Sequence, residues 1–384
     1  MVKSFHHVSL SKVLTYCSEK INYYSGKGSD LKNYGYIDVG TVRNNYSRFV
    51  KKGFKIIHNG YTSGTTGRPS KFLRDFHSIA AEQYFQDMHF GWKNKYKVIF
   101  RGEKLFKLED KPSKIYRIVP FINEMYISSY HISDESLKPV VEKLKNIENK
   151  CLWAYPSSAY MLAEYCIRNN QEIEFDLVVT SSEKITEYQL EVIEKAFHCR
   201  VKDWYGLAER TCALYRCEYG HYHEVTGYSH VEYLQIDEGA HEIVGTTLHN
   251  KVMPLVRYRT GDIVSLSKEI CQCGSIGTNI LEVHGRKSSF IELSGKKIPE
   301  CLFGCLLKST KNVLEFQVVQ TKEKRIIYKI VKNNKFSPED EKLLLGTVYS
   351  LFPQEICSVQ YVDKIQREKN GKIKLVVNEN NESA

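Results

Sequence analysis

Apolar positions along the chain switch between helical and strand-like spacing. Over 134–147 apolar residues recur every three or four positions, which predicts a helix that begins at an N-cap of Ser133 or Asp134. The short apolar run 175–179 predicts a buried strand, and Thr186 then precedes a second helical pattern. Strands that alternate with helices in this way indicate an α/β fold with mostly parallel sheets.

The pattern changes after residue 286. Short apolar runs at 316–320 and 326–331 predict two strands, and a helix is expected to begin near Pro338. We therefore expect two domains, a large α/β domain over 1–286 and a small α+β domain over 287–384.

Composition excludes several classes of protein. The chain has 384 residues, with 55 Lys and Arg against 45 Asp and Glu, a formal net charge of +10. This excess is spread along the chain, and no nucleic-acid motif accompanies it, so it indicates a solvated surface. The sequence lacks an apolar stretch of transmembrane length and a secretory leader pattern. These features predict a soluble, cytoplasmic protein with no membrane span and no nucleic-acid partner.

The segment 61–71 reads Tyr-Thr-Ser-Gly-Thr-Thr-Gly-Arg-Pro-Ser-Lys. Small residues let backbone amides approach an anion, the hydroxyls add donors, and Arg68 or Lys71 adds charge, which together suit a polyphosphate. The loop is not a Walker A loop, because Pro69 and Ser70 stand where that motif has its Gly-Lys pair. The alternative is a flexible turn with no ligand.

This loop resembles that of the adenylate-forming superfamily of acyl-CoA synthetases and nonribosomal peptide adenylation domains, which reads Ser-Gly-Thr-Thr-Gly-x-Pro-Lys. This sequence departs from it by one inserted residue, Ser70. Further family stretches follow in order, namely Trp204–Glu209, Tyr258–Asp262, Gly285–Arg286 and Asn370–Lys372. The stretches SSYHISDESLKPVVEKL, AYPSSAYMLAEY and EIVGTTLHNKVMPLVRYRTGD look most like the phenylacetate-CoA ligase branch, particularly its CapK-type capsular-polysaccharide relatives. The resemblance covers roughly residues 55–375.

The resemblance implies a role for each matched residue. It assigns the β- and γ-phosphates of ATP to the loop residues Thr62, Ser63, Gly64, Thr65, Thr66, Gly67 and Lys71. It assigns Mg²⁺ to Glu209, adenine stacking to Tyr205, the adenine edge to Ser182 and Glu183, the ribose hydroxyls to Asp262, and the ribose-phosphate region to Arg286 at a hinge. Gly206, beside Tyr205, is also among the implied nucleotide-binding residues. An ionised carboxylate suits both hard Mg²⁺ and ribose hydroxyl donors. For each residue taken alone, an ordinary surface or packing role is the alternative.

Lys372 matches the superfamily's catalytic lysine. Asn370-Gly371 predicts a two-residue hairpin turn that presents Lys372 at its tip. Adenylation brings together two anions, a carboxylate and the α-phosphate of ATP, so a cation between them lowers the barrier. The resemblance implies that the small domain is mobile and delivers this lysine. Family members usually have a charged hinge residue where this chain has Ser288.

A zinc site is predicted from cysteine and histidine spacing. Eleven cysteines, an odd number in a long chain, indicate reduced thiols or metal ligands. Cys217, His223, Cys271 and Cys273 together offer three thiolates and one imidazole, a set that suits structural Zn²⁺. Such positions also recur in the branch named above. His221 is a competing imidazole, and reduced, partly buried cysteines are the alternative.

We therefore expect an ATP-dependent ligase that forms an acyl-adenylate and pyrophosphate. The acyl group would then pass to coenzyme A or to another thiol or amine, such as a carrier protein or an amino sugar. By resemblance, the small carboxylic acid would lie near Tyr130, His131, Tyr155 and Ser157, although aromatic packing explains these residues equally well. The resemblance also implies a role in capsule or O-antigen polysaccharide biosynthesis. The alternative is a nucleotide-binding regulator or partner that keeps the fold without turnover.

Overall fold

The structure is a computed structural model that describes residues 5, 8–53, 58–61, 70–103, 105–107, 110, 112–275, 277–286, 290–293, 296–299, 312–352, 356–368 and 373–380. The chain divides into two compact units. Unit 1 holds residues 1–91 and 204–287, and unit 2 holds 92–203 and 288–384. Residues 92–203 thus belong to the same compact unit as the C-terminal residues. The separate small domain that was expected over 287–384 stays a prediction. Within these ranges, no helix has both the length and the apolar character that crossing a bilayer requires.

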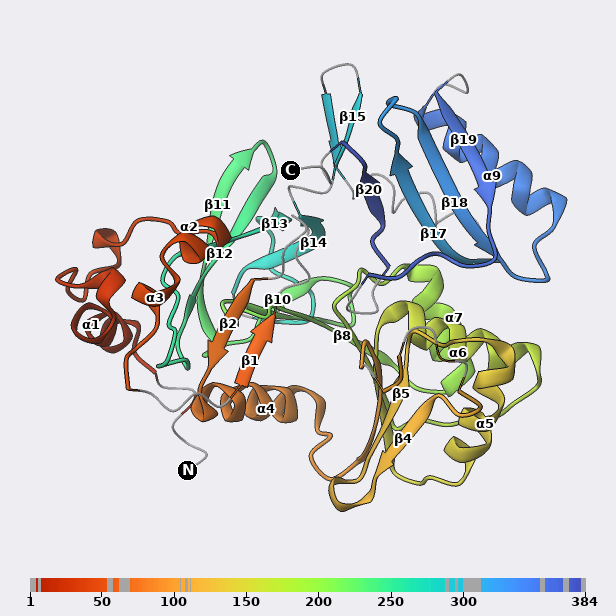
Figure 1. Ribbon diagram of the computed structural model, residues 1–384, viewed down its shortest axis with the longest axis horizontal. Coiled ribbons are helices and arrows are strands. Elements are labelled where there is room, and N and C mark those ends of the chain that lie inside the picture. The colour runs from red at the N-terminus through yellow and green to blue at the C-terminus, as the bar shows by residue number, and fades with distance from the viewer. Residues whose placement is uncertain are drawn as a thin grey trace. The chain divides into compact units, whose positions relative to one another are not determined.

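Unit 1 contains N-terminal helices, a two-stranded hairpin and an antiparallel sheet (Figure 1). Its helices are α1 (Leu10–Lys20), α2 (Val39–Asn44), α3 (Tyr46–Phe49) and α4 (Phe76–Phe90), with short 3₁₀ turns η2 (Asn22–Tyr24) and η3 (Leu31–Asn33). Its strands are β1 (His58–Tyr61), β2 (Lys71–Arg74), β9 (Ala213–Arg216), β10 (Tyr222–Glu224), β11 (Ser229–Asp237), β12 (Ala240–Thr247), β13 (Tyr258–Ser267) and β14 (Asn279–Arg286), together with the end of β8 (Val201–Gly206).

The antiparallel sheet of unit 1 has the strand order β11-β12-β13-β14-β10-β9-β8. The segment that leads into β13 is held by the N-terminal helices, because Leu14, Phe49, Val256 and Tyr258 share one buried cluster. The Tyr24 hydroxyl also accepts the Val256 backbone N–H at 3.0 Å. This packing fixes the start of β13, where the Tyr258–Asp262 motif begins.

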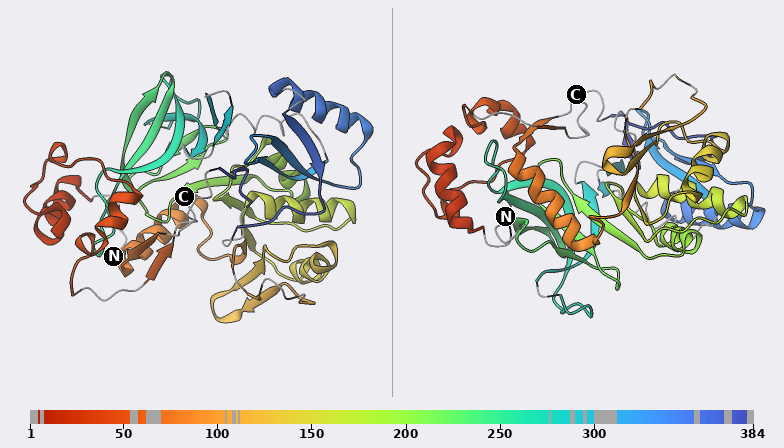
Figure 2. Two further views of the ribbon diagram at one scale, coloured as in Figure 1. Left: turned by 45° about the horizontal axis from the view of Figure 1, so that its top comes forward. Right: turned by 90° about the horizontal axis from the view of Figure 1, so that it is seen from below.

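Unit 2 contains a mostly parallel sheet with helices and a second, C-terminal sheet (Figure 2). Its first part has β3 (Tyr96–Arg101), β4 (Tyr116–Val119), η4 (Pro120–Ile122), β5 (Glu124–Ser128), α5 (Asp134–Lys145), β6 (Lys150–Ala154), α6 (Pro156–Arg168), β7 (Leu177–Ser181) and α7 (Glu187–Phe197). Its C-terminal part has β15 (Phe290–Leu293), β16 (Lys296–Pro299), β17 (Val313–Gln320), β18 (Ile326–Lys332), α9 (Pro338–Leu351), β19 (Cys357–Tyr361) and β20 (Val376–Asn378).

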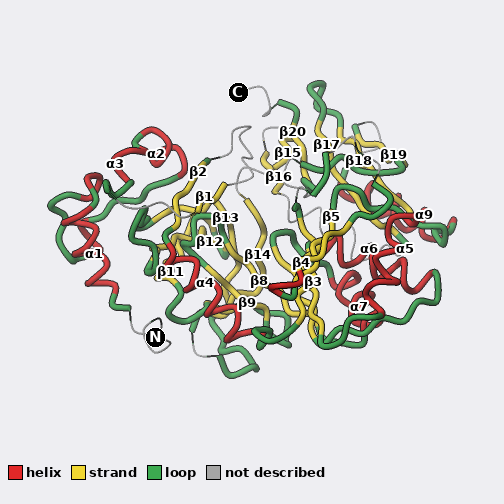
Figure 3. The backbone as a smooth tube through the Cα atoms, turned by 60° about the horizontal axis from the view of Figure 1, so that its bottom comes forward, coloured by secondary structure: helices red, strands yellow, loops and turns green. Residues whose placement is uncertain are grey.

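Strands β7, β6, β3 and β5 of unit 2 are parallel neighbours, and β4 adds an antiparallel edge. Helices α5, α6 and α7 lie together beside these strands (Figure 3), where Leu137, Tyr160 and Ile193 join Val98 and Leu152 in one buried core. The sequence prediction of an α/β fold with mostly parallel strands is confirmed by this sheet. The antiparallel sheet of unit 1 was not predicted.

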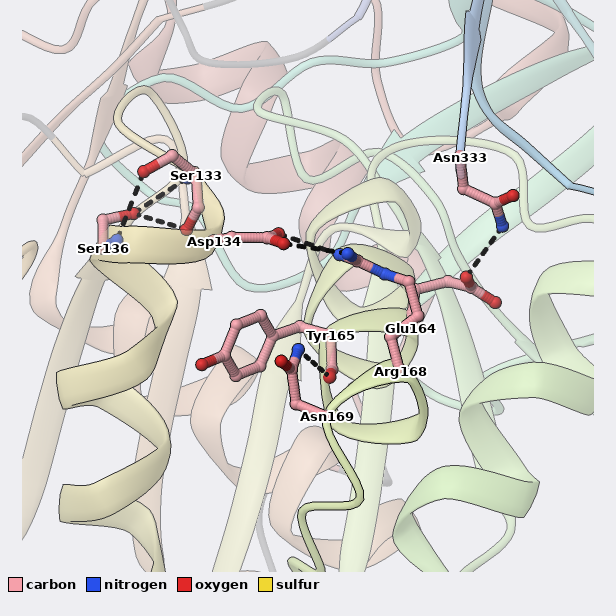
Figure 4. Close-up of polar contacts among 8 residues, drawn as sticks. All are labelled: Ser133, Asp134, Ser136, Glu164, Tyr165, Arg168, Asn169 and Asn333. Atoms are coloured by element: carbon pink, nitrogen blue, oxygen red, sulfur yellow. Dashed lines mark hydrogen bonds and ion pairs between the residues drawn. The ribbon is translucent and has the colours of Figure 1, made fainter. Parts of the chain in front are cut away.

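Local sequence signals explain where the helices begin. Helix α5 begins after Ser133, whose hydroxyl accepts the Ser136 N–H while the Ser136 hydroxyl accepts the Ser133 N–H (Figure 4). The Thr186 hydroxyl accepts the Gln189 N–H in the same way at the start of α7. Both predicted helix starts are confirmed.

The C-terminal sheet has the order β19-β18-β17-β20, with α9 packed against it through Leu344 and Val348. Strand β20 pairs in parallel with β17, and β19 pairs in parallel with β18. The strands before and after Asn370-Gly371 therefore lie at opposite edges of the sheet. The described residues on either side of that dipeptide do not form the paired strands that the predicted hairpin requires, and the turn itself lies outside the described residues.

Candidate nucleotide and acyl-group site

In unit 1, two distant motifs meet, one at the end of β8 and the other in the first half of β13. The Tyr205 hydroxyl donates to Asp262 Oδ2 at 2.6 Å, and the Asp262 side chain is buried. The adenine-stacking and ribose-binding candidates are thus in direct contact although 57 positions separate them. Gly206 closes the strand, and a Cβ there would lie 2.9 Å from Trp204 Nε1, which favours glycine.

A buried glutamate that sequence reasoning missed shapes the Tyr258–Asp262 turn. Glu242 on β12 accepts the Gly261 N–H at 3.1 Å and the Arg259 guanidinium at 2.5 Å. Gly261 has φ +77°, a conformation that favours glycine. The only sequence signal for this role was a charged residue inside an apolar strand. Because Glu242 fixes the backbone next to Asp262, it determines where that carboxylate lies.

Glu209 is buried beside the same turn. Its Oε1 accepts the Tyr258 hydroxyl at 2.8 Å. The flanking backbone is fixed as well, since Arg74 donates to the Ala208 carbonyl at 2.6 and 3.1 Å and Arg210 pairs with Glu82 at 2.8 Å. A buried carboxylate on a fixed turn fits a hard cation such as Mg²⁺. The sequence did not single out the two arginines.

The remaining unit 1 candidates are only partly described. Residues Thr62 to Gly67 of the predicted phosphate loop lie outside the described residues, and Lys71 is exposed at the start of β2. The inserted Ser70 is buried, and its hydroxyl accepts Arg43 Nη2 at 2.9 Å. Arg286 lies opposite Asp262 in the β13–β14 register, which brings these two backbone positions together.

In unit 2, the candidate acyl-site residues gather at the carboxyl ends of the parallel strands. Such edges are where open α/β sheets bind ligands. Arg101 ends β3, and its guanidinium lies 4.3 Å from the Trp153 ring centroid and 5.5 Å from that of Tyr155. Arg101 also donates to Ser182 Oγ at 2.8 Å. Sequence reasoning missed Arg101, whose signal was a cation at the end of a short apolar run.

Ser182 follows β7 with φ +75°, a backbone conformation that is strained for a residue with a side chain. Strain of this kind costs about 1–3 kcal/mol and concentrates at functional sites. The hydrogen bond from Arg101 holds Ser182 in this conformation. This geometry is consistent with a functional role for residues 182–183 at the end of β7. Their contact with the adenine base of ATP stays a prediction.

Glu183 joins two chain segments of unit 2. Its Oε2 accepts the Ser157 N–H at 3.1 Å, at the start of α6. Its Oε1 accepts the Ile373 N–H at 3.3 Å. Lys372 itself lies outside the described residues, but the residue that follows it in the chain is bonded to Glu183. The backbone next to Lys372 is thus at the predicted adenine edge.

Two of the acyl-pocket candidates have structural partners. His131 Nε2 lies 3.0 Å from the Lys107 carbonyl and Nδ1 lies 2.8 Å from Ser128 Oγ, so Nε2–H donates to the carbonyl and Nδ1 accepts from the serine. The Tyr130 hydroxyl donates to the Gly102 carbonyl at 3.3 Å. Both side chains tie loops to the strand ends, which favours the packing alternative for them.

The four predicted zinc ligands converge in unit 1. One ligand atom each from Cys217, His223, Cys271 and Cys273 lies within 4.8 Å of all the others. Sγ of Cys217 and Sγ of Cys271 are 3.7 Å apart, and Cys273 Sγ lies 3.2 Å from His223 Nε2. The competing His221 contacts Cys271 Sγ through Nδ1 at 3.3 Å. The structure therefore brings together the half-sites from β9–β10 and the loop before β14.

Protonation chemistry separates Cys271 from other cysteines of the chain, including Cys217 of the same cluster, in which burial raises the pKa to about 11. Burial raises the pKa of Cys151 and Cys166 to about 12, so these thiols stay protonated. Burial also acts to raise the pKa of Cys271, but hydrogen bonds with Cys273 and Cys217 outweigh it and the pKa is lowered. Burial lowers the pKa of His223, which keeps its imidazole neutral. Thiolates and a neutral imidazole are the forms that bind zinc.

Comparison with known proteins identifies the fold and a relative. A family model described as the CapK C-terminal domain matches residues 290–379. Protein CapK of Staphylococcus aureus is 26% identical over 374 residues, which cover 94% of this chain and 83% of CapK. A crystal structure of 2-hydroxyisobutyryl-CoA ligase in the postadenylation state with 2-HIB-AMP superposes with a TM-score of 0.67 over 96% of this chain and 88% of that ligase, at 15% identity. This chain is a CapK homologue with the adenylate-forming ligase fold.

The CapK homologue also matches the phenylacetate-coenzyme A ligase of Thermus thermophilus, at 33% identity over 82 residues. That match covers 21% of this chain and 18% of that ligase. The superfamily predicted from the motifs is thus confirmed, and the fold agrees with it. At 15% identity the structural likeness carries the fold alone.

Proposed function

We propose that this CapK homologue activates a small carboxylic acid with ATP, forming an acyl-adenylate and releasing pyrophosphate. The observation that carries the proposal is a pair of hydrogen bonds between the same two motifs, one from Tyr205 to Asp262 and one from Tyr258 to Glu209. These residues come from two family motifs that the fold brings together, each with the side-chain chemistry that its implied role requires. The acyl group would pass to a thiol or amine, with coenzyme A, a carrier protein or an amino sugar as the acceptors that the resemblance implies.

The reaction brings a carboxylate oxygen to the α-phosphorus as the bond to pyrophosphate breaks. In this proposal Asp262 accepts hydrogen bonds from the ribose hydroxyls, Tyr205 stacks on adenine, and Lys372 lies between the two anions. Glu209 holds Mg²⁺, which neutralises phosphate charge when bound. The carboxyl edge of the unit 2 strands, with Tyr155 and Ser157, borders the acid. The CapK relationship supports a role in capsule or O-antigen polysaccharide biosynthesis as part of the same proposal.

We also propose that Cys217, His223, Cys271 and Cys273 bind a structural zinc ion. Ligand atoms of a tetrahedral zinc site lie about 3.5–3.8 Å apart, given typical Zn–S and Zn–N bond lengths. The Cys217–Cys271 separation of 3.7 Å fits this spacing, and the 3.2 Å between Cys273 and His223 is slightly shorter. Four protein ligands leave no open position for substrate, so the ion would act by tying two chain segments together.

The test of the main proposal is carboxylate-dependent exchange of labelled pyrophosphate into ATP, screened across carboxylic acids with Mg²⁺ present. The expected result is exchange with one chemical class of acid and none without acid. ATP binding without exchange for any acid would favour a nucleotide-binding regulator instead. If ATP does not bind at all, both alternatives are wrong.

A further inference from the structure

The segment that precedes Lys372 is anchored inside unit 2 by one arginine. Arg367 Nη2 donates to Glu315 Oε1 at 2.7 Å, and Arg367 Nη1 donates to Ser157 Oγ at 3.3 Å. The other carboxylate oxygen of Glu315 accepts the Ile365 N–H at 3.3 Å. Glu315 lies on β17 and Ser157 lies in the first turn of α6. Arg367 thus connects the C-terminal sheet, the Lys372 segment and a helix of the first part of the unit.

The ion pair between Arg367 and Glu315 is largely excluded from solvent. The Arg367 side chain is 11% exposed and that of Glu315 is 5% exposed. Burying both charges is costly, so a pair of this kind is weak evidence for stability and is more informative about geometry. Burial raises the pKa of Glu315 although Arg367 acts to lower it, which shows how little water reaches the carboxylate. What the pair specifies is the position of Arg367 relative to β17 and α6.

A second contact holds the other end of the same segment. Ile373 N–H donates to Glu183, and Glu183 also accepts the N–H of Ser157. Ser157 is therefore bound twice, by its hydroxyl to Arg367 and by its amide to Glu183. The chain on both sides of Lys372 is fixed to the same turn of α6, the turn that borders the candidate acyl pocket.

We propose that Arg367 is a positioning residue for Lys372, holding the lysine segment on α6 in the arrangement that forms the acyl-adenylate. The inference rests on the proposed function and adds a residue to it that the sequence did not reveal. Arg367 acts through geometry, since its Nη1 and Nη2 groups are directed to Ser157, Glu315 and Met161. A displacement of about 1 Å at a reacting group lowers a rate by about 10²-fold. In this proposal, acyl transfer from a preformed adenylate uses a second arrangement, as the mobile small domain implied by the resemblance would allow.

The test compares Arg367→Ala with Arg325→Ala, a matched control on the exposed turn between β17 and β18. Arg367→Ala is expected to lower kcat for ATP-pyrophosphate exchange by about 10²-fold, with KM for ATP and for the acid nearly unchanged. Consumption of supplied acyl-adenylate with a thiol should stay within about threefold of wild type. Arg367→Lys, which keeps the charge but not the forked geometry, should restore part of the exchange.

A double-mutant cycle shows whether Arg367 acts through Lys372. In a Lys372→Ala background, Arg367→Ala should cause little further loss of exchange, because the residue it positions is gone. Additive losses, or equal loss of both half-reactions, would overturn the proposal. So would a folded Arg367→Ala enzyme with normal exchange.

Removing one partner of a buried pair can unfold the protein, so the pair is also removed together. The Glu315→Gln/Arg367→Met variant leaves no unpaired buried charge. It should melt near the wild-type temperature and still lose exchange selectively, and normal exchange in this variant would overturn the proposal. If the wild type shows no exchange with any acid, the proposed function fails and the positioning role fails with it. An active wild type with an unaffected pair variant removes the positioning role alone.

Discussion

At the residue scale, nucleotide recognition is expected to depend on the charge of Asp262. Asp262→Asn keeps the size of the side chain but removes its negative charge and one acceptor. A hydrogen bond to a charged group contributes about 1.5–3 kcal/mol, so the Kd for AMP should rise by about 10- to 100-fold. Calorimetric titration with AMP measures the change.

Tyr205→Phe is the matched control for Asp262→Asn. It removes the hydroxyl that contacts Asp262 Oδ2 but keeps the aromatic ring that is proposed to stack on adenine. AMP affinity should fall much less than in Asp262→Asn, because stacking persists. Equal losses in the two variants would indicate that the Tyr205–Asp262 bond, and not ribose recognition, is what matters at this position.

Lys372 is the residue whose removal should separate the two half-reactions. Lys372→Ala is expected to lower ATP-pyrophosphate exchange by about 10²–10³-fold, the usual loss when one group that stabilises transition-state charge is removed. It should still consume a supplied acyl-adenylate in the presence of the acceptor. Lys364→Ala, an exposed lysine of the same segment, serves as the control. A Lys372→Ala enzyme that loses both activities equally would contradict the assignment.

At the element scale, local signals predicted helices well and strand pairing poorly. Ser133 and Thr186 were recognised as helix starts because a cap depends on residues within one turn. The Asn370-Gly371 turn was expected on equally local grounds and lies outside the described residues, while the described strands on either side of it, β19 and β20, lie at opposite edges of their sheet. Strand partners are set by the whole sheet, so a dipeptide cannot specify them.

The cluster of Cys217, His223, Cys271 and Cys273 joins two such elements, the β9–β10 hairpin and the loop that precedes β14. Purified protein is expected to contain about one zinc per chain, the amount a single four-ligand site holds. Cys271→Ser/Cys273→Ser should lose the metal and melt at a lower temperature, because the ion no longer ties the two segments together. Metal analysis and thermal unfolding measure both effects.

Cys199→Ser is the control, since Cys199 is partly buried and has no place in the cluster. It should keep the metal and the melting temperature. Zinc retained in the Cys271→Ser/Cys273→Ser variant would show that the cluster is not the site. In that case the converging cysteines would be reduced core residues, as in the alternative stated from the sequence.

At the scale of the whole molecule, the motifs predicted the superfamily and the α/β architecture, but not the residues that orient the site. Tyr205, Glu209 and Asp262, which are proposed to bind the nucleotide and its metal ion, stand in recognisable motifs. Glu242 holds the turn that carries Asp262, Arg101 holds Ser182, and the Arg367 pair is proposed to hold the segment before Lys372; their partners lie far away in the chain. Such roles depend on tertiary contacts, which residue types and spacing do not encode.

Residues 288–384 group with 92–203 in unit 2, so the C-terminal residues contact α6 in this arrangement. If acyl transfer requires a second arrangement, the C-terminal domain must leave α6 during turnover. Asn333, between β18 and α9, donates to Glu164 Oε2 of α6 at 3.0 Å, and both side chains are buried (Figure 4). A reducible cross-link between cysteines at these two positions would hold the C-terminal sheet on α6. The Glu164→Cys/Asn333→Cys protein, treated with a short bifunctional thiosulfonate, is expected to keep ATP-pyrophosphate exchange.

Acyl transfer by the cross-linked protein should fall by at least about tenfold and return on reduction, because the lock blocks a conformational step and not the chemistry. Each single-cysteine variant, treated identically, should transfer at its untreated rate, which separates the cross-link from labelling of native thiols. Full transfer in cross-linked protein would mean that one arrangement serves both half-reactions. The Arg367 contacts would then support acyl transfer as well as adenylation. Arg367→Ala should in that case lower both half-reactions, and not adenylation alone.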